Sequence, residues 1–87
     1  MLFSLMACET TPPAQEMSDA RQAIAMAKEA GAAELAAFHF KAAEDYLESA
    51  RQALNEGEYS EARRNAKHAK MKAFDALRET EAASDKD

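Results

Sequence analysis

The chain has 87 residues, 22 of them alanine, and contains neither valine nor tryptophan. This length suits one small domain and excludes a large enzyme that carries its own cofactor-binding fold. Leucine, methionine, glutamate, lysine and arginine make up much of the remainder, and these residues favour helix over strand, so we expect an all-α protein. The net charge of −5 argues against general nucleic-acid binding, which depends on a basic surface.

The first eight residues are uncharged and nearly all apolar, and polar residues begin at Glu9. Leu5, Met6, Ala7 and Cys8 resemble a bacterial lipobox, in which an aliphatic residue and a small residue precede a cysteine that receives lipid. The resemblance implies that residues 1–7 are part of a lipoprotein signal peptide. Because a complete signal begins with positive charge, we infer that Met1 is an internal or mis-assigned start. In the alternative interpretation, this segment is the apolar start of a helix in a cytosolic protein.

Residues 8–16 are predicted to be the lipidated Cys8 followed by a short linker. Pro12 and Pro13 resist helix formation and favour an extended chain, which reaches about 25 Å at roughly 3.1 Å per residue. In lipoproteins of enteric type, aspartate after the cysteine favours retention in the inner membrane. Glu9 stands there instead, so the resemblance implies a periplasmic location at the bacterial outer membrane rather than the inner one.

Gly31 and Gly57 are the only glycines, and both are predicted to end helices because glycine adopts the left-handed conformation found there. The expected helices span residues 18–30, 33–56 and 59–82. Short connections between them predict an antiparallel three-helix bundle, a helical hairpin plus one further helix, over residues 17–82. A polar tail is expected over residues 83–87.

Apolar spacing predicts the face that each helix buries, with Ser18 as the N-cap of the first helix. The first helix is expected to bury Ala20, Ala23, Ile24, Ala27 and Ala30. The second is expected to bury Leu35, Phe38, Ala42, Ala43, Tyr46, Leu47, Ala50, Ala53 and Leu54. The third is expected to bury Tyr59, Ala62, Ala66, Ala69, Ala73, Ala76 and Leu77. An alanine seam allows close helix packing, and Phe38, Phe40, Tyr46, Tyr59 and Leu47 are expected to fill the remaining space.

The same positions resemble a family of small, alanine-rich bacterial lipoproteins known as domain of unknown function 4398 (DUF4398). The resemblance covers residues 17–82 and rests on three groups of residues. These are Asp19 to Ile24 with Ala30-Gly31-Ala32, Ala42-Ala43-Glu44 with Ala53-Leu54, and Gly57 to Arg63 with Ala66 and Ala69. Many members have proline near the start of the second helix, where this chain has Ala36-Ala37-Phe38. The resemblance implies an envelope setting, with envelope proteins or peptidoglycan-associated proteins as partners, and brings no catalytic residues.

No catalytic, metal or cofactor site is expected. His39 and His68 lie on different predicted helices, without a further histidine or cysteine at ligand spacing. Glu44 and Glu48 lie one turn apart on an exposed face, where a solvated pair is far more common than an acid–base dyad. We therefore predict that the protein is not an enzyme.

Arg63, Lys67 and Lys70 line one edge of the third predicted helix and are candidates for contact with an anionic surface. The alternative, which we favour, is ordinary pairing across the bundle with Glu44, Asp45 and Glu48.

Together these patterns predict a non-catalytic, lipid-anchored envelope protein with a structural or interaction role, as a monomer or weak oligomer. One alternative is an alanine-zipper oligomer of envelope lipoproteins, although two glycines interrupt the single helix that it requires. Another is a soluble cytosolic adapter, because Gly57-Glu58-Tyr59 with Ala62 resembles part of a tetratricopeptide hairpin.

Overall fold

The computed structural model describes residues 11–85, and every regular element within this range is an α-helix. The elements in chain order are α2 (Ala14–Glu29), α3 (Ala32–Leu35), α4 (Ala37–Asn55) and α5 (Tyr59–Asp85). The predicted all-α class is confirmed. The three long helices correspond to the three expected ones, and α3 is a single additional turn at the first corner.

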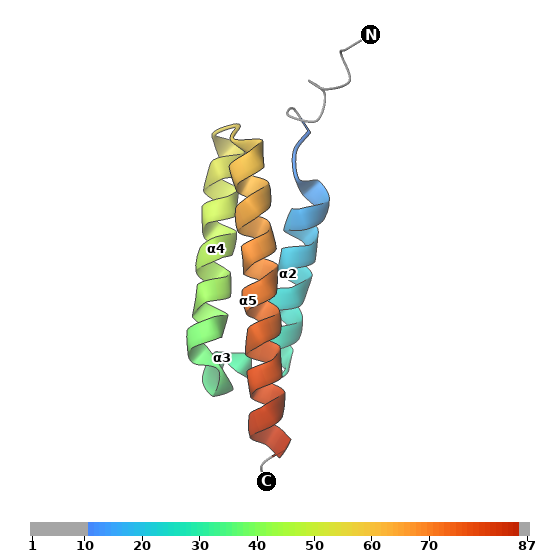
Figure 1. The fold of residues 1–87 in the computed structure, drawn as a ribbon, viewed down its shortest axis with the longest axis vertical. Coiled ribbons are helices and arrows are strands. Elements are labelled where there is room, and N and C mark those ends of the chain that lie inside the picture. Colours follow the sequence, from blue (N-terminus) through green and yellow to red (C-terminus); the bar gives the residue numbers. More distant parts are fainter. Residues whose placement is uncertain (1–10, 86–87) are drawn as a thin grey trace.

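The long helices form an up-down-up bundle in which α5 lies between α2 and α4 and contacts both (Figure 1). α4 runs opposite to α2 and α5, which run parallel to each other. The start of α2 lies at the same end of the bundle as the turn between α4 and α5. α3 closes the opposite end. Consecutive long helices are therefore antiparallel, as the short connections predicted.

α2 begins earlier than expected, with Pro13 at the N-cap instead of Ser18. The Met17 amide donates to the Pro13 carbonyl over 2.9 Å, which closes the first turn. Proline is tolerated at a helix start because the amide hydrogen that it lacks would have no partner inside the helix. Ser18 thus lies inside α2, and the linker predicted through residue 16 is helical from Ala14 onward.

Both glycines end helices as predicted, with φ of 96° at Gly31 and 78° at Gly57. At the second turn the Gly57 amide donates to the Leu54 carbonyl over 3.0 Å, and the Glu58 amide donates to the Ala53 carbonyl over 2.9 Å. This pair of bonds is the Schellman arrangement, which satisfies carbonyls at the end of α4. It allows α5 to begin at Tyr59 after a very short connection.

The helix expected over 33–56 is interrupted at Ala36, whose φ of −143° and ψ of 51° are not helical. The large side chains on either side of this break differ in burial. Phe40 is buried with 6% exposure, whereas Phe38 is 80% exposed and Leu35 is 49% exposed. The prediction that Leu35 and Phe38 belong to the core is therefore wrong, whereas the prediction that Phe40 fills the core is confirmed. Phe38 and Phe40 lie about 200° apart around α4, and Phe40 is on the side that carries Ala43 and Ala50.

The core is built almost entirely from alanine: apart from Pro13, thirteen of the fifteen buried apolar residues of the described chain are alanine, and the other two are Met17 and Phe40. The predicted seam of α5 is confirmed at five alanines that have no exposed surface, namely Ala62, Ala66, Ala69, Ala73 and Ala76. Tyr59 and Leu77 at its ends are only partly buried, and Ala30, directly after α2, is exposed. Thr80 extends the same spacing and is 1% exposed.

Three clusters divide this core along the bundle axis, and each contains residues of α2, α4 and α5. Met17 packs with alanines near the α4–α5 turn. Ala23, Ala43 and Ala73 meet in the middle. Phe40 of α4 packs with Ala27, Ala32, Ala36 and Ala76 at the end closed by α3. Because alanine is small, each cluster depends on close approach of the helices and on one or two larger side chains.

Candidate functional site

The predicted lipobox, Leu5, Met6, Ala7 and Cys8, lies outside the described residues. The described chain begins at Thr11, three positions after Cys8. How the chain enters the bundle from Thr11 onward is therefore the structural feature that bears most directly on an anchor at Cys8.

The entry segment, residues 11–16, is attached to α5 by one arginine. The Arg63 guanidinium donates through Nη2 to the Thr11 carbonyl oxygen over 2.9 Å. Its Nε lies 3.5 Å from Oε2 of Glu16, and both side chains are 29% exposed. Pro13 between these two contacts is fully buried. Residues 11–16 therefore lie against the bundle, although the sequence predicted an extended spacer over this range.

The basic edge of α5 faces α2 rather than the acidic residues of α4. Arg63 pairs with Glu16 of α2. Lys67 is exposed, and Lys70 is half-buried beside α2. Lys70 lines a hollow of about 200 Å³ between α2 and α5, together with Asp19, Gln22, Ala23, Met26 and Phe74.

The acidic residues expected to pair with this edge form ion pairs within α4 instead. Asp45 Oδ1 lies 3.1 Å from Nζ of Lys41, and Glu48 Oε1 lies 3.9 Å from Nε of Arg51. Both are pairs within a helix between well-exposed side chains, and such pairs contribute little to stability. The cross-helix pairing that we favoured over an anionic-surface contact is therefore wrong for Asp45 and Glu48.

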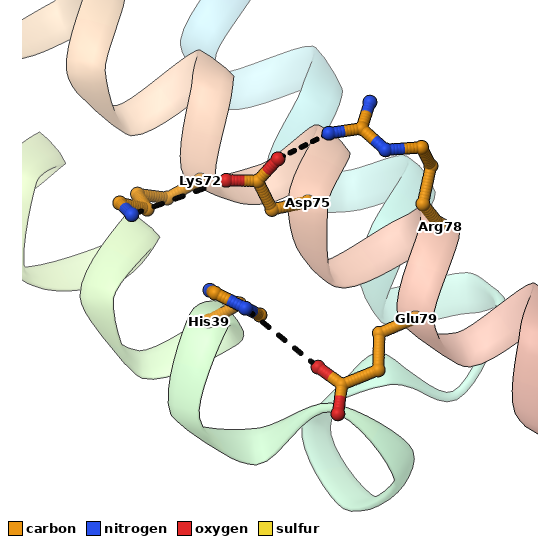
Figure 2. Close-up of polar contacts among 5 residues, drawn as sticks. All are labelled: His39, Lys72, Asp75, Arg78 and Glu79. Carbon is orange, nitrogen blue, oxygen red and sulfur yellow. Dashed lines mark hydrogen bonds and ion pairs between the residues drawn. The ribbon is translucent and has the colours of Figure 1, made fainter.

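A second group of polar contacts lies near the end of the bundle closed by α3 (Figure 2). His39 Nε2 of α4 lies 3.9 Å from Oε1 of Glu79 of α5, so the pair joins the two helices. Asp75 contacts Arg78 and also lies 3.9 Å from Nζ of Lys72. His39 Nδ1 is buried without a hydrogen-bond partner. The His39–Glu79 pair links the second half of α5 to α4, and the contacts of Asp75 lie within α5.

The two histidines, His39 and His68, do not form one site, because each ring contacts a different aromatic side chain. The His68 ring stacks on Tyr46 with centroids 5.1 Å apart, whereas His39 meets the ring of Phe38 edge-on at 5.5 Å. Within residues 11–85 no group of three or more histidine, cysteine, aspartate or glutamate side chains is arranged to hold a metal ion. Tyr46, expected in the core, is half-buried at the edge between α4 and α5.

The entry contact is the feature that sequence reasoning missed. Pro13, Met17 and Ala20 follow the four- and three-residue steps of a helix face, and all three are buried. This spacing was the available signal that the helix face starts at Pro13. The partner of Glu16 was not predictable from spacing, since Arg63 lies 47 positions later in the chain.

These observations define the class of the protein as a small three-helix bundle with an alanine core and a basic helix edge turned toward its own amino-terminal segment. None of the described helices has the length and apolar character needed to cross a bilayer. The family model for the domain of unknown function DUF4398 matches residues 15–87, so the chain belongs to that family, as its motifs suggested. Neither the curated proteins nor the solved structures compared with the chain include a significant match.

Proposed function

We propose that this protein is a non-catalytic component of the bacterial cell envelope, anchored by lipid on Cys8, that acts through structural or protein contacts. The observation that carries the proposal is the order of features along the chain. An uncharged apolar segment ends in Leu5-Met6-Ala7-Cys8, a polar segment with two prolines follows, and a folded bundle begins at Ala14. Lipoproteins place a folded domain directly behind a lipidated cysteine in this order.

The surface of the bundle supports a role in contacts rather than in chemistry. Its hollows lie on the surface of the described bundle. The one beside the α4–α5 turn, about 560 Å³, is lined by residues 56–61 and Arg64, and three of these residues are glutamate. Enzyme sites are usually concave, largely apolar pockets with a few converging polar groups, which this acidic turn does not resemble.

The proposed location is the periplasmic face of the outer membrane. The support is Glu9 at the position after Cys8, where lipoproteins held in the inner membrane have aspartate in enteric bacteria. Envelope proteins, including those associated with peptidoglycan, are the proposed partners.

The anchor is testable by labelling in bacteria. The chain is expressed behind a complete signal segment in cells fed an alkyne fatty acid, and membranes are washed with high salt. We expect label on the protein and retention in the salt-washed membranes, because the contact is hydrophobic and is not screened. Cys8→Ser removes the only thiol of the chain, so label and membrane retention are expected to disappear together.

Met6→Leu is the matched control, since it changes the neighbouring lipobox position while keeping its apolar character, and it is expected to behave as the unmodified chain. Unlabelled protein in the soluble fraction, despite a complete signal, contradicts the proposal and favours the cytosolic adapter. Crosslinking of the labelled protein in intact cells then identifies whether its partners are envelope proteins.

A further inference from the structure

Three successive positions of the entry segment make contacts that hold it against the bundle. The Thr11 carbonyl accepts from Arg63, Pro13 is buried, and Glu16 pairs with the same guanidinium. Met17, one position further, is 3% exposed and packs in the core cluster nearest the α4–α5 turn. The path of the chain is thus defined from Thr11 onward, at a fixed place beside the first turns of α5.

This arrangement leaves only a short stretch of chain between an anchor at Cys8 and the bundle, so the anchored bundle has little freedom to move. A linker of eight residues, 9–16, reaches about 25 Å in extended form and permits any orientation of the domain. Cys8 is only three residues from Thr11, a span of at most about 11 Å. An anchored bundle with its entry segment attached to α5 is therefore restricted to a narrow range of heights and tilts.

We propose that Arg63 is a positioning residue that sets the orientation of the bundle on the membrane, with the α4–α5 turn facing the bilayer and the α3 corner facing away. This inference rests on the proposed lipid anchor at Cys8. The start of α2 and the α4–α5 turn lie at the same end of the bundle, and α3 lies at the other (Figure 1). The contact of Arg63 with both Thr11 and Glu16 links this end to the segment that leads to Cys8.

The orientation determines what the protein presents to partners. α4 has 19 residues, so its two ends are about 28 Å apart at 1.5 Å per residue. Glu56 and Glu58 of the turn lie at the membrane end. Leu35 and Phe38, which are exposed, lie at the distal end. The apolar side chains of the corner are consequently held away from the lipid and directed toward the periplasmic space.

The inference is testable on vesicles without the cellular lipidation machinery. The single cysteine of the chain, Cys8, is coupled to a maleimide headgroup lipid in phosphatidylcholine vesicles. Because the chain has no tryptophan, one introduced tryptophan is an unambiguous fluorescent reporter. Tyr59→Trp places it at the membrane end and Phe38→Trp at the distal end. Quenching by lipids with a nitroxide headgroup then reports which end lies near the bilayer.

We expect the Tyr59→Trp reporter to be quenched several-fold more strongly than the Phe38→Trp reporter. Adding Arg63→Gln is expected to reduce the difference, because Thr11 then loses its contact with α5 and the tether lengthens to the stretch between Cys8 and the buried Pro13. Arg64→Gln, at the exposed neighbouring position, removes the same charge and is expected to leave the difference unchanged. Helix content and melting temperature are measured for each variant to show that the bundle is intact.

A second variant keeps the test independent of the folding of Arg63→Gln. Insertion of six glycine and serine residues between Glu9 and Thr10 leaves Arg63 and its contacts in place but lengthens the tether, and it is expected to reduce the difference as well. Equal quenching of both reporters in the unaltered background overturns the orientation. A difference that persists undiminished in folded Arg63→Gln overturns the role of Arg63. Since the coupling is chemical, neither outcome depends on whether cells lipidate Cys8.

Discussion

The two phenylalanines on either side of His39 provide the sharpest test of the fold. Phe40 is 6% exposed and packs among Ala27, Ala32, Ala36 and Ala76, whereas Phe38 is 80% exposed. Phe40→Ala is therefore expected to remove a core side chain, and Phe38→Ala the same atoms from the surface. Because both variants lose the same phenyl ring, the difference between their stabilities measures the effect of burial.

The expected cost of Phe40→Ala follows from the area that the ring buries. An aromatic side chain buries about 200 Å², which at about 25 cal/mol per Å² corresponds to about 4 to 5 kcal/mol. The alanines around the ring are too short to fill the space, so the cavity is expected to persist. Deletions of this kind typically cost about 3–5 kcal/mol, in agreement with the value from the buried area. A domain of this size has a free energy of unfolding of about 4 to 11 kcal/mol, so the variant loses a large share of it.

Urea unfolding followed by circular dichroism at 222 nm measures both variants. With a slope of about 2 kcal/mol per molar urea, Phe40→Ala is expected to lower the midpoint by about 2 M or to unfold outright. Phe38→Ala is expected to change stability by less than about 0.5 kcal/mol. Equal midpoints for the two variants, or a larger effect at Phe38, refute the assignment of Phe40 rather than Phe38 to the buried face of α4.

Three other substitutions test the packing and the turn. Ala73→Leu places three extra carbons where three helices meet and is expected to lower Tm by about 10 °C or more, whereas Ala82→Leu, exposed on the same helix, is expected to be nearly neutral; comparable Tm values contradict the seam. Gly57→Ala is expected to cost about 1 kcal/mol because of its φ of 78° alone, since a Cβ there meets no atom within 4 Å; an unchanged urea midpoint speaks against strain at this turn. Glu79→Gln is expected to alter stability by less than about 0.5 kcal/mol, because the ion pair with His39 is long and partly exposed, and a larger loss in the same assay shows that the pair is stronger than its geometry implies.

Local patterns along the chain were sufficient for the class of the fold, the number of long helices and the buried seam of α5. Alanine at steps of three and four identifies a helix face wherever it occurs, and Gly31 and Gly57 mark helix ends because glycine alone adopts a positive φ without strain. These signals depend on neighbouring residues only, and the motifs built from them were also specific enough to identify the family, whose model matches residues 15–87.

The break at Ala36, the exposure of Phe38 and the attachment of Thr11 to Arg63 required the tertiary structure. Ala36 has no local signal for a non-helical conformation, and it adopts one where the chain turns the corner and packs against Ala27 and Ala76. Arg63 reaches Thr11 across 52 positions of chain, and only the parallel packing of α2 and α5 brings them together. Helix faces depend on local periodicity, whereas corners and long-range contacts depend on how completed helices fit one another.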